Sequence, residues 1–457
     1  MVDFFVYDLV FLFLFVIGVF YFIKKHKKTL DREGWIYMYR TQWAVNFINY
    51  IGKKYEKILS KLRYLIVVIG YFLMAGILYL FGTTVVRYIK EPWISDIIKA
   101  PPVAPLIPYF PKLFGMENYF PSFYFTYFLI AIAVVAFVHE FSHGIFMKFS
   151  KIKIKSTGII FLGPILGAFV EEDKKSFDGK GKFNRLSVLG AGVFANLITG
   201  IIFFFLAWGL FNVSYVSEGY IVTDYVYEIL PTDSILGVEN YSDDLVLVNT
   251  TKGEYFGIKG WDFQEGGLVK LYFDSPAIRN KLRGNIIEFN GEKVNGRDNF
   301  YSSFNDFKIG ETIEIKMLDN DQISEYSLEL VEHPHNSSKS FLGIVGRGLD
   351  PKENLKEFSL YTLLFHLKGS AIDYQPIYSF FGFIFNLLWW IMIINFLVAL
   401  FNMLPLGILD GGQFFYVTIL AITKNERLSK KIYSLLGRII FLAFVLLMFV
   451  WAYRLAF

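Results

Sequence analysis

The chain has 457 residues, of which 54% are hydrophobic, and its mean hydropathy of +0.43 is higher than that of ordinary soluble domains. The net charge of +4 is small for this length, which argues against nucleic-acid binding and fits basic loops beside membrane helices. The chain contains no cysteine, so disulfides and thiolate metal ligands are excluded. Any bound metal must therefore be held by histidine, aspartate or glutamate.

Six apolar runs are long enough to cross a bilayer as helices, which takes roughly 20 residues each. They are residues 4–23, 64–81, 123–145, 186–211, 380–404 and 433–451. The first run lacks a basic leading segment and a small-residue cleavage site, so it is predicted to be a retained helix and not a signal peptide. The sequence predicts a polytopic α-helical membrane protein.

Lysine and arginine gather in three of the segments between these runs, at residues 24–63, 148–185 and 424–431. Basic loops of membrane proteins stay on the cytoplasmic side. Six spans with three cytoplasmic loops place both termini outside, together with the acidic-leaning region 215–368. We expect a multi-pass protein of the plasma membrane.

The third apolar run contains His139, Glu140 and His143 in the sequence HEFSHG. Ionisable residues at membrane depth are costly and usually functional. On a helix, positions i and i+4 share a face, so both histidines can bind one ion while Glu140 lies beside it as a general base. This pattern predicts a zinc hydrolase with its active site in the membrane. A histidine that only hydrogen-bonds a neighbouring helix is the alternative.

Catalytic zinc usually has three protein ligands, and Asp410 is the candidate for the third. It follows the fifth run at the same predicted depth as the histidines, in the sequence NMLPLGILDGG. Proline and glycine make a straight helix improbable there, so the segment can turn the carboxylate toward the histidines. The alternative is that Asp410 only caps the next helix, predicted to begin near Gln413.

Two segments match motifs of a known family: HEFSHG at 139–144 fits HExxH, and NMLPLGILDG at 402–411 fits NxxPxxxLDG. On these residues the chain resembles the site-2 protease family of intramembrane zinc metalloproteases. The resemblance implies that His139, His143 and Asp410 bind one Zn²⁺ and that Glu140 is the catalytic base. It also implies that Asn196 and Asn402 support the substrate or the transition state. The substrate would be a transmembrane protein, cut within or near its membrane segment in regulated intramembrane proteolysis.

Residues 156–172 form two short apolar runs around Gly163 and Pro164, which predicts a β-hairpin. In the family, such a hairpin dips into the membrane beside the active site, where its edge could pair with an unwound substrate.

Residues 215–357 have a soluble composition with alternating strands. The sequence SPA at 275–277 and the segment 284–291 resemble a PDZ domain, which captures extended peptides. This second domain is longer than one PDZ domain needs, so residues 220–263 are either a further module or an elaboration.

These observations predict six regions. Residues 1–83 hold two N-terminal helices and a cytoplasmic loop, 84–122 an outer loop, 123–211 two core helices with the hairpin, 215–357 the PDZ-like domain, 375–412 the third core helix and 413–457 a C-terminal helix. Predicted partners are membrane lipid, a transmembrane substrate and a peptide on the PDZ-like domain, with no nucleic acid. Two alternatives remain: a membrane zinc protease of the prenyl-peptide processing type, and a non-enzymatic metal transporter or receptor.

Overall fold

The structure is a computed structural model that describes most of the chain. The described residues are 4–90, 101–102, 106–116, 120–217, 219–242, 244–260, 267–294, 296–319, 322–347, 374–376, 378–407 and 409–456. The chain divides into two compact units, Met1–Asn212 with Phe380–Phe457, and Val213–Ser379. Each unit is described by itself.

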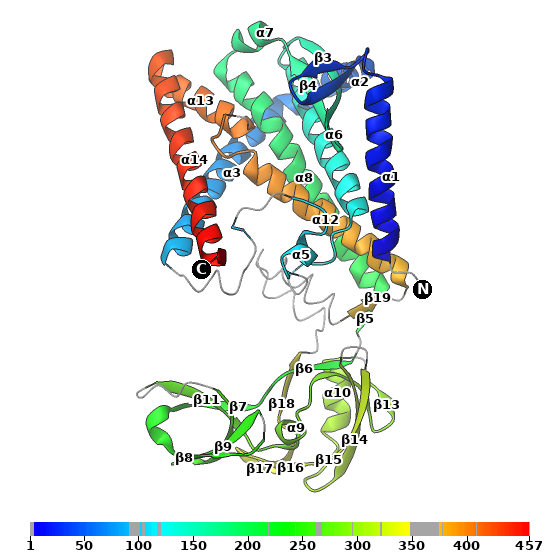
Figure 1. The fold of residues 1–457 in the computed structure, drawn as a ribbon, viewed down its shortest axis with the longest axis vertical. Coiled ribbons are helices and arrows are strands. Elements are labelled where there is room, and N and C mark those ends of the chain that lie inside the picture. The colour runs from blue at the N-terminus through cyan, green and yellow to red at the C-terminus, as the bar shows by residue number, and fades with distance from the viewer. Residues whose placement is uncertain are drawn as a thin grey trace. The chain divides into compact units, whose positions relative to one another are not determined.

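Among the described residues, six helices of the first unit are long and apolar enough to cross a membrane (Figure 1). They are α1 (Phe4–Lys25), α3 (Glu56–Lys90), α6 (Phe125–Phe149), α8 (Lys182–Ser214), α12 (Ser379–Phe401) and α14 (Glu426–Ala456). Each helix contains one of the predicted runs or most of it, so the predicted class of polytopic α-helical membrane protein is confirmed. Helices α3 and α14 are much longer than predicted, because their charged ends continue the helix beyond the apolar part.

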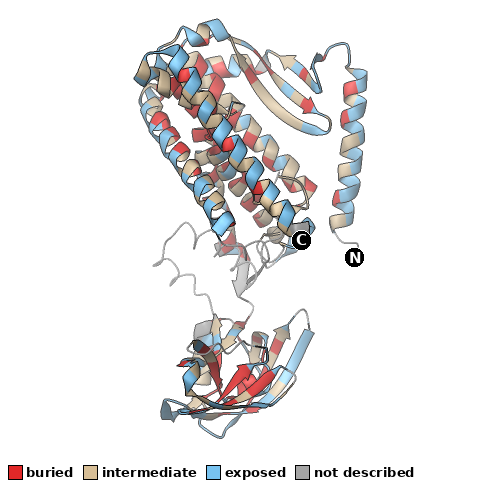
Figure 2. Cartoon of the chain, turned by 60° about the vertical axis from the view of Figure 1, so that its left-hand side comes forward, coloured by how far each residue is buried: buried red, intermediate tan, exposed pale blue. Residues whose placement is uncertain are grey.

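The helices differ in how much of their surface the protein covers. Helix α8 is the most enclosed of the six, whereas α1 and α14 expose most of their apolar side chains (Figure 2). In a membrane protein such apolar exposure is directed at lipid. Four shorter helices are described in this unit: α2 (Trp43–Lys54), α5 (Phe110–Leu113), α7 (Lys174–Asp178) and α13 (Asp410–Thr423).

Helix α1 is fastened to the start of α6 by a buried carboxylate. Asp8 is 1% exposed and accepts hydrogen bonds from the backbone N–H groups of Phe125 (2.6 Å) and Thr126 (3.0 Å). The hydroxyl of Tyr109 donates a further bond of 2.6 Å. The residue before α6, Tyr124, makes no side-chain cap, so Asp8 satisfies the free N–H groups of α6 from a different helix.

A four-stranded antiparallel sheet lies at one end of this unit, in the order β1-β2-β3-β4. Its strands are β1 (Asp31–Glu33), β2 (Ile36–Thr41), β3 (Ile154–Leu162) and β4 (Ile165–Glu172). Strands β3 and β4 form the predicted hairpin. The segment predicted as a cytoplasmic loop between the first two spans contains β1, β2 and α2, which were not predicted. A three-residue and a six-residue strand carry too little periodicity to be recognised without their partner β3.

The second unit is rich in strands, which confirms the predicted β-rich domain. Its strands and short helices are β5 (Tyr215–Ser217), β6 (Tyr220–Tyr225), β7 (Tyr227–Pro231), η1 (Thr232–Ser234), β8 (Ile235–Asn240), β9 (Leu245–Thr250), β10 (Gly253–Ile258), β11 (Leu268–Phe273), α9 (Pro276–Arg279), β12 (Gly284–Phe289), β13 (Glu292–Lys293), α10 (Arg297–Phe304), β14 (Thr312–Asp319), β15 (Gln322–Glu329), β16 (Val331–His333), β17 (Asn336–Phe341), β18 (Ile344–Arg347) and β19 (Tyr374–Pro376). They make a six-stranded sheet, β15-β14-β12-β6-β18, to which β13 adds, a five-stranded sheet, β7-β11-β10-β9-β8, and two small pairs.

The segment that resembles a PDZ domain has a regular local structure. Residues 276–279 form a helical turn, and β12 and β13 pair across Asn290 and Gly291, which both have positive φ. An Asn-Gly pair in this conformation is the preferred two-residue hairpin turn. The five-stranded sheet has a hydrophobic core separate from that of the six-stranded sheet. Residues 261–266 and 348–357 of the predicted domain lie outside the described residues.

Candidate active site

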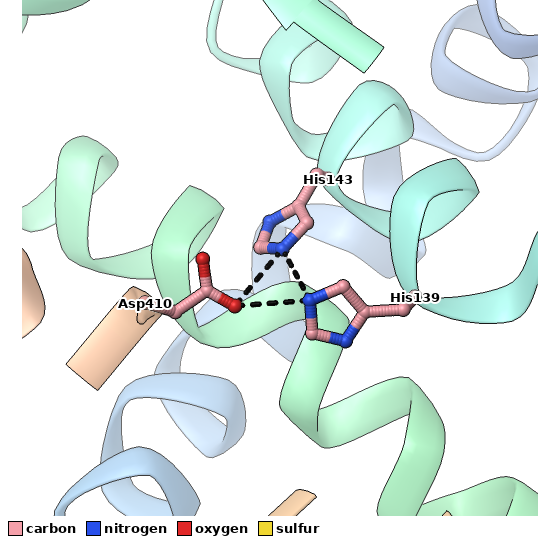
Figure 3. A group of neighbouring side chains, drawn as sticks. All are labelled: His139, His143 and Asp410. Atoms are coloured by element: carbon pink, nitrogen blue, oxygen red, sulfur yellow. Dashed lines mark hydrogen bonds and ion pairs between the residues drawn. The ribbon is translucent and has the colours of Figure 1, made fainter. Parts of the chain in front are cut away.

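Three side chains from distant parts of the sequence meet at one point in the first unit (Figure 3). The Nε2 atoms of His139 and His143 lie 3.0 Å apart, and Oδ2 of Asp410 lies 3.0 Å from the first and 3.2 Å from the second. Both histidines are buried. The structure thus brings together the three predicted ligands, two from α6 and one from the first residue of α13.

This arrangement fits a zinc ion. Zinc bonds to histidine nitrogen and carboxylate oxygen measure about 2.0–2.2 Å, so tetrahedral ligand atoms lie roughly 3.3 Å from one another. The observed separations of 3.0, 3.0 and 3.2 Å are close to this edge length. Two neutral imidazoles and a carboxylate are a donor set that zinc accepts, and they leave a fourth position for water.

Each histidine has a second partner that fixes its ring. Nδ1 of His143 donates to the carbonyl of Val188 at 2.8 Å, which leaves the lone pair of Nε2 free for a metal. Nδ1 of His139 lies 3.0 Å from the side-chain amide of Asn196, which is fully buried in α8. The amide carbonyl of Asn196 has no partner, and turning the amide lets this oxygen accept from Nδ1–H. Asn196 therefore lies directly behind a ligand histidine.

A glycine of α8 leaves the space in which the two imidazoles sit. A Cβ atom on Gly192 would lie 2.5 Å from Nε2 of His143 and 2.8 Å from Nε2 of His139. Any larger residue would press on both ligand atoms. Gly192 and Asn196 are four residues apart, so one face of α8 both makes room for the histidines and orients one of them. The spacing of four residues between Gly192 and Asn196 can be seen in the sequence, but their contact with the histidines cannot.

A sharp turn between α12 and α13 brings Asp410 to the histidines. Helix α12 ends at Phe401, and the N–H of Gly411 bonds to the carbonyl of Asn402 at 2.7 Å. A Cβ atom on Gly411 would lie 2.2 Å from the backbone of Met403, and one on Gly412 would lie 2.1 Å from the carbonyl of Leu406. Only glycines permit this close fold. Asp410 begins α13, but its Oδ2 faces the histidines, so the interpretation as a simple cap does not describe its position.

Asn402 takes part in this turn through its backbone. Its side chain is half-buried. Ile408, within the same motif, lies outside the described part of the chain.

Glu140 points toward the sheet. Its Oε2 accepts a hydrogen bond of 2.9 Å from the backbone N–H of Val170 in β4. It lies outside the group of three possible metal ligands, as predicted for a base that is not a ligand. Strand β4 is thus in direct contact with Glu140, next to a metal-ligand candidate.

One arginine ties all four strands of the sheet together. The guanidinium of Arg40 in β2 donates to Asp31 of β1 (2.7 Å), to Ser156 of β3 (2.7 Å) and to Glu171 of β4. The hydrogen bond from Arg40 lowers the pKa of the Glu171 carboxyl below its usual value. Glu171 follows Val170 directly, so this network fixes the end of β4 that contacts Glu140. This network was not predicted, because its four members come from separate strands.

A largely apolar cavity of 460 Å³ extends from Glu140 between α6 and β4. It is bordered by Phe15 of α1, by Leu129, Ala136 and Glu140 of α6, and by Leu166 and Ala168 of β4. The hairpin tip is apolar and exposes Leu162 and Ile165. Residues 166–170 of β4 line the cavity together with residues of β2 and β3, so the hairpin and α6 enclose an apolar space next to Glu140.

Comparison with known proteins places this site in a family. Residues 127–448 match the profile of peptidase family M50, and this stretch contains all three ligand candidates and Glu140. An uncharacterized protein of Methanocaldococcus jannaschii is 29% identical over 308 residues, which make up 66% of this chain and 60% of that protein. The chain thus spans less than two thirds of that relative's length. The match to the family extends over more than half of the chain, and the chain belongs to peptidase family M50, the site-2 protease family of membrane metallopeptidases.

Proposed function

We propose that the protein is an intramembrane zinc metalloprotease that hydrolyses peptide bonds within or near the membrane segments of other proteins. The observation that carries this proposal is the convergence of His139, His143 and Asp410 at 3.0–3.2 Å inside a membrane-spanning unit. Family membership supports the metallopeptidase activity. The identity of the metal, the roles of the residues and the substrate class are proposed here.

The residues divide the chemistry between them. Zinc bound by the three ligands would lower the pKa of a water molecule to about 7 and polarise a carbonyl group. Glu140 takes a proton from the attacking water on its carboxylate and later gives that proton to the leaving amide nitrogen. Asn196 holds the ring of His139, and Asn402 supports the substrate or the transition state from the turn before Asp410.

The substrate binds as an extended strand along β4. A peptide bond inside a transmembrane helix is shielded by the helix itself, so the segment must unwind before attack. The N–H of Val170 bonds to Glu140 and so points away from β3. Residues two apart in a strand point the same way, so the N–H and carbonyl groups of Ala168 and Leu166 also point outward. Strand addition at these residues would pair the substrate backbone and bring it toward Glu140.

The remaining assignments follow the same proposal. The protein resides in the plasma membrane with the β-rich domain outside, where this PDZ-like domain binds a peptide or restricts access of substrates. The cleaved segment is released in regulated intramembrane proteolysis. The basic segments at residues 24–63, 148–185 and 424–431 support this orientation.

The variant Glu140→Gln tests the proposal. It should retain bound zinc, because Glu140 is not a ligand, and lose cleavage of a model transmembrane substrate by at least about 10²-fold, the usual contribution of a general base. Zinc content by mass spectrometry and substrate cleavage in proteoliposomes measure the two properties separately. Turnover at the parent rate with zinc bound would remove Glu140 from the mechanism.

A further inference from the structure

The short helix α2 has a surface that the proteolytic site does not explain. It lies between the end of α1 and the start of α3, two membrane-spanning helices, and has 12 residues. A helix of this length is about 18 Å long, too short to cross a bilayer. It therefore connects two membrane-spanning helices without crossing the bilayer itself, at the same end of the unit as β3 and β4 (Figure 1).

One face of α2 packs against the helix that carries both ligand histidines. The buried residues Ala44, Ile48 and Gly52 recur every four positions. A Cβ atom on Gly144, next to His143, would lie 2.7 Å from Ile48, and one on Gly52 would lie 2.9 Å from Lys148. The two helices touch through these glycines, so α2 fixes the position of α6 at the end where the histidines lie.

The opposite face of α2 is exposed and combines aromatic with basic side chains. It presents Tyr50, which is 56% exposed, followed by Lys53 and Lys54. Phe47 lies at the border of this face: it is 47% exposed, and its ring centroid is 5.8 Å from that of Phe141 in α6. Nζ of Lys54 lies 2.8 Å from the hydroxyl of Tyr50. Aromatic rings at headgroup depth with lysines beside them are the pattern of an interfacial helix that binds anionic lipid.

Neighbouring segments carry the same character. Exposed lysines flank α2 in the sequence: Lys24 and Lys25 end α1, Lys27 and Lys28 follow it, and Lys57 and Lys61 lie in α3. Trp35, in the turn between β1 and β2, is 88% exposed. An exposed tryptophan in a turn is typical of the membrane interface. All of these residues precede residue 127, so they lie outside the stretch that matches the family.

We propose that the exposed face of α2, with its flanking lysines, binds the phosphate headgroups of anionic phospholipids and thereby holds α6 at a fixed depth. The occupant is lipid because the lysines flank exposed Tyr50 and Trp35 in a segment between two membrane-spanning helices, and these rings find apolar contacts in a bilayer that a water-soluble anion would not offer. This inference concerns a surface remote from the metal ligands, and lipid binding can be measured without proteolysis.

The test measures lipid selectivity of the full chain in bilayers. Spin-labelled phosphatidylglycerol and phosphatidylcholine are compared by electron paramagnetic resonance as the fraction immobilised by the parent protein and by the triple variant Lys53→Gln/Lys54→Gln/Lys57→Gln. Each lysine near an anionic surface strengthens the attraction about fivefold, so the variant should lose at least about fivefold in preference for phosphatidylglycerol. The parent's preference should also fall as salt is raised.

A matched control removes the same charge elsewhere. The variant Lys293→Gln/Lys308→Gln/Lys339→Gln neutralises three exposed lysines of the β-rich unit, which carries no membrane-spanning helix among its described residues, and should keep the parent's selectivity. Equal selectivity in the parent and the α2 variant would overturn the proposal. That result would leave the lysines as topology signals or as a site for an acidic protein segment.

Discussion

At the scale of single residues, the site depends on its polar side chains and on the absence of a side chain at Gly192. At Gly192, the imidazoles of His139 and His143 occupy the space that a Cβ atom would need. Asn196, one turn along α8, faces Nδ1 of His139. The two candidate metal ligands of α6 are thus positioned by α8. Orienting partners of this kind commonly change metal affinity by 10–100-fold when removed.

Gly192→Ala should weaken zinc binding by at least about tenfold and slow cleavage accordingly. A helical alanine is more favourable than glycine by about 1 kcal/mol, so the helix itself should be retained. The added methyl group would displace Nε2 of both histidines. Zinc affinity by competition with a chromophoric chelator, together with helical content by circular dichroism, checks this expectation.

The same helix provides a control. A Cβ atom on Gly209 would meet nothing within 4 Å, so Gly209→Ala should bind zinc as the parent does. If Gly192→Ala and Gly209→Ala have the same zinc affinity, the space beside the histidines does not matter for the metal.

At the scale of elements, the sheet links distant parts of the chain to Glu140. Strand β4 is the last strand of the sheet, and its outward N–H groups face α6 and the cavity. One of them, on Val170, holds Glu140. Strands β1 and β2 extend the hairpin on the other side, and Arg40 ties them to the end of β4. The edge of the sheet is therefore both a contact for the base and the proposed binding site for substrate.

Ala168→Pro should impair the use of substrate while it leaves zinc in place. Proline removes the outward N–H of Ala168, and it is tolerated in an edge strand when that N–H is not part of the ladder. We expect KM for a transmembrane substrate to rise severalfold, because one backbone hydrogen bond contributes about 0.5–1.5 kcal/mol. Ala168→Val keeps the N–H and adds bulk, so an equal rise in KM for both variants would indicate steric blocking and not strand pairing.

The features that could be predicted from the sequence are local ones, and those that were missed depend on contacts between distant residues. The membrane helices, the β3–β4 hairpin and the three ligand candidates were predicted because each lies in a run or motif that can be recognised within a short stretch of sequence. Strand β2 was missed because it becomes a strand only beside β3, more than 100 residues later. The hydrogen bonds that Asp8 accepts from the first N–H groups of α6 were missed for the same reason, since the partners are more than 100 residues apart in the sequence.

At the scale of the whole molecule, the orientation in the membrane determines where the site opens. In the orientation proposed above from the basic segments, Lys54 and Lys424 lie in the cytoplasm and the β-rich unit lies outside. The metal ligands of α6 lie near the end that precedes the basic segment 148–185, which corresponds to the cytoplasmic side in this orientation.

Single cysteines test this orientation cleanly, because the chain has no cysteine of its own. A membrane-impermeant maleimide should label Asn336→Cys on intact cells, and it should label Lys54→Cys and Lys424→Cys only after permeabilisation. All three positions are exposed in the structure, so accessibility depends on the side of the membrane. The reverse pattern would place the metal ligands near the outer face.

The central claim is that His139, His143 and Asp410 together hold a catalytic zinc ion, and the zinc content of purified Asp410→Ala tests it most directly. The parent and Asp173→Asn should each contain about one zinc per chain, because Asp173 caps α7, its side chain accepting from the N–H of Ser176, and asparagine can serve that role. Asp410→Ala should lose most of its zinc and all cleavage while still inserting into the membrane. If Asp410→Ala retained zinc with the parent's affinity, Asp410 would not be a ligand, and the account of the active site would be contradicted.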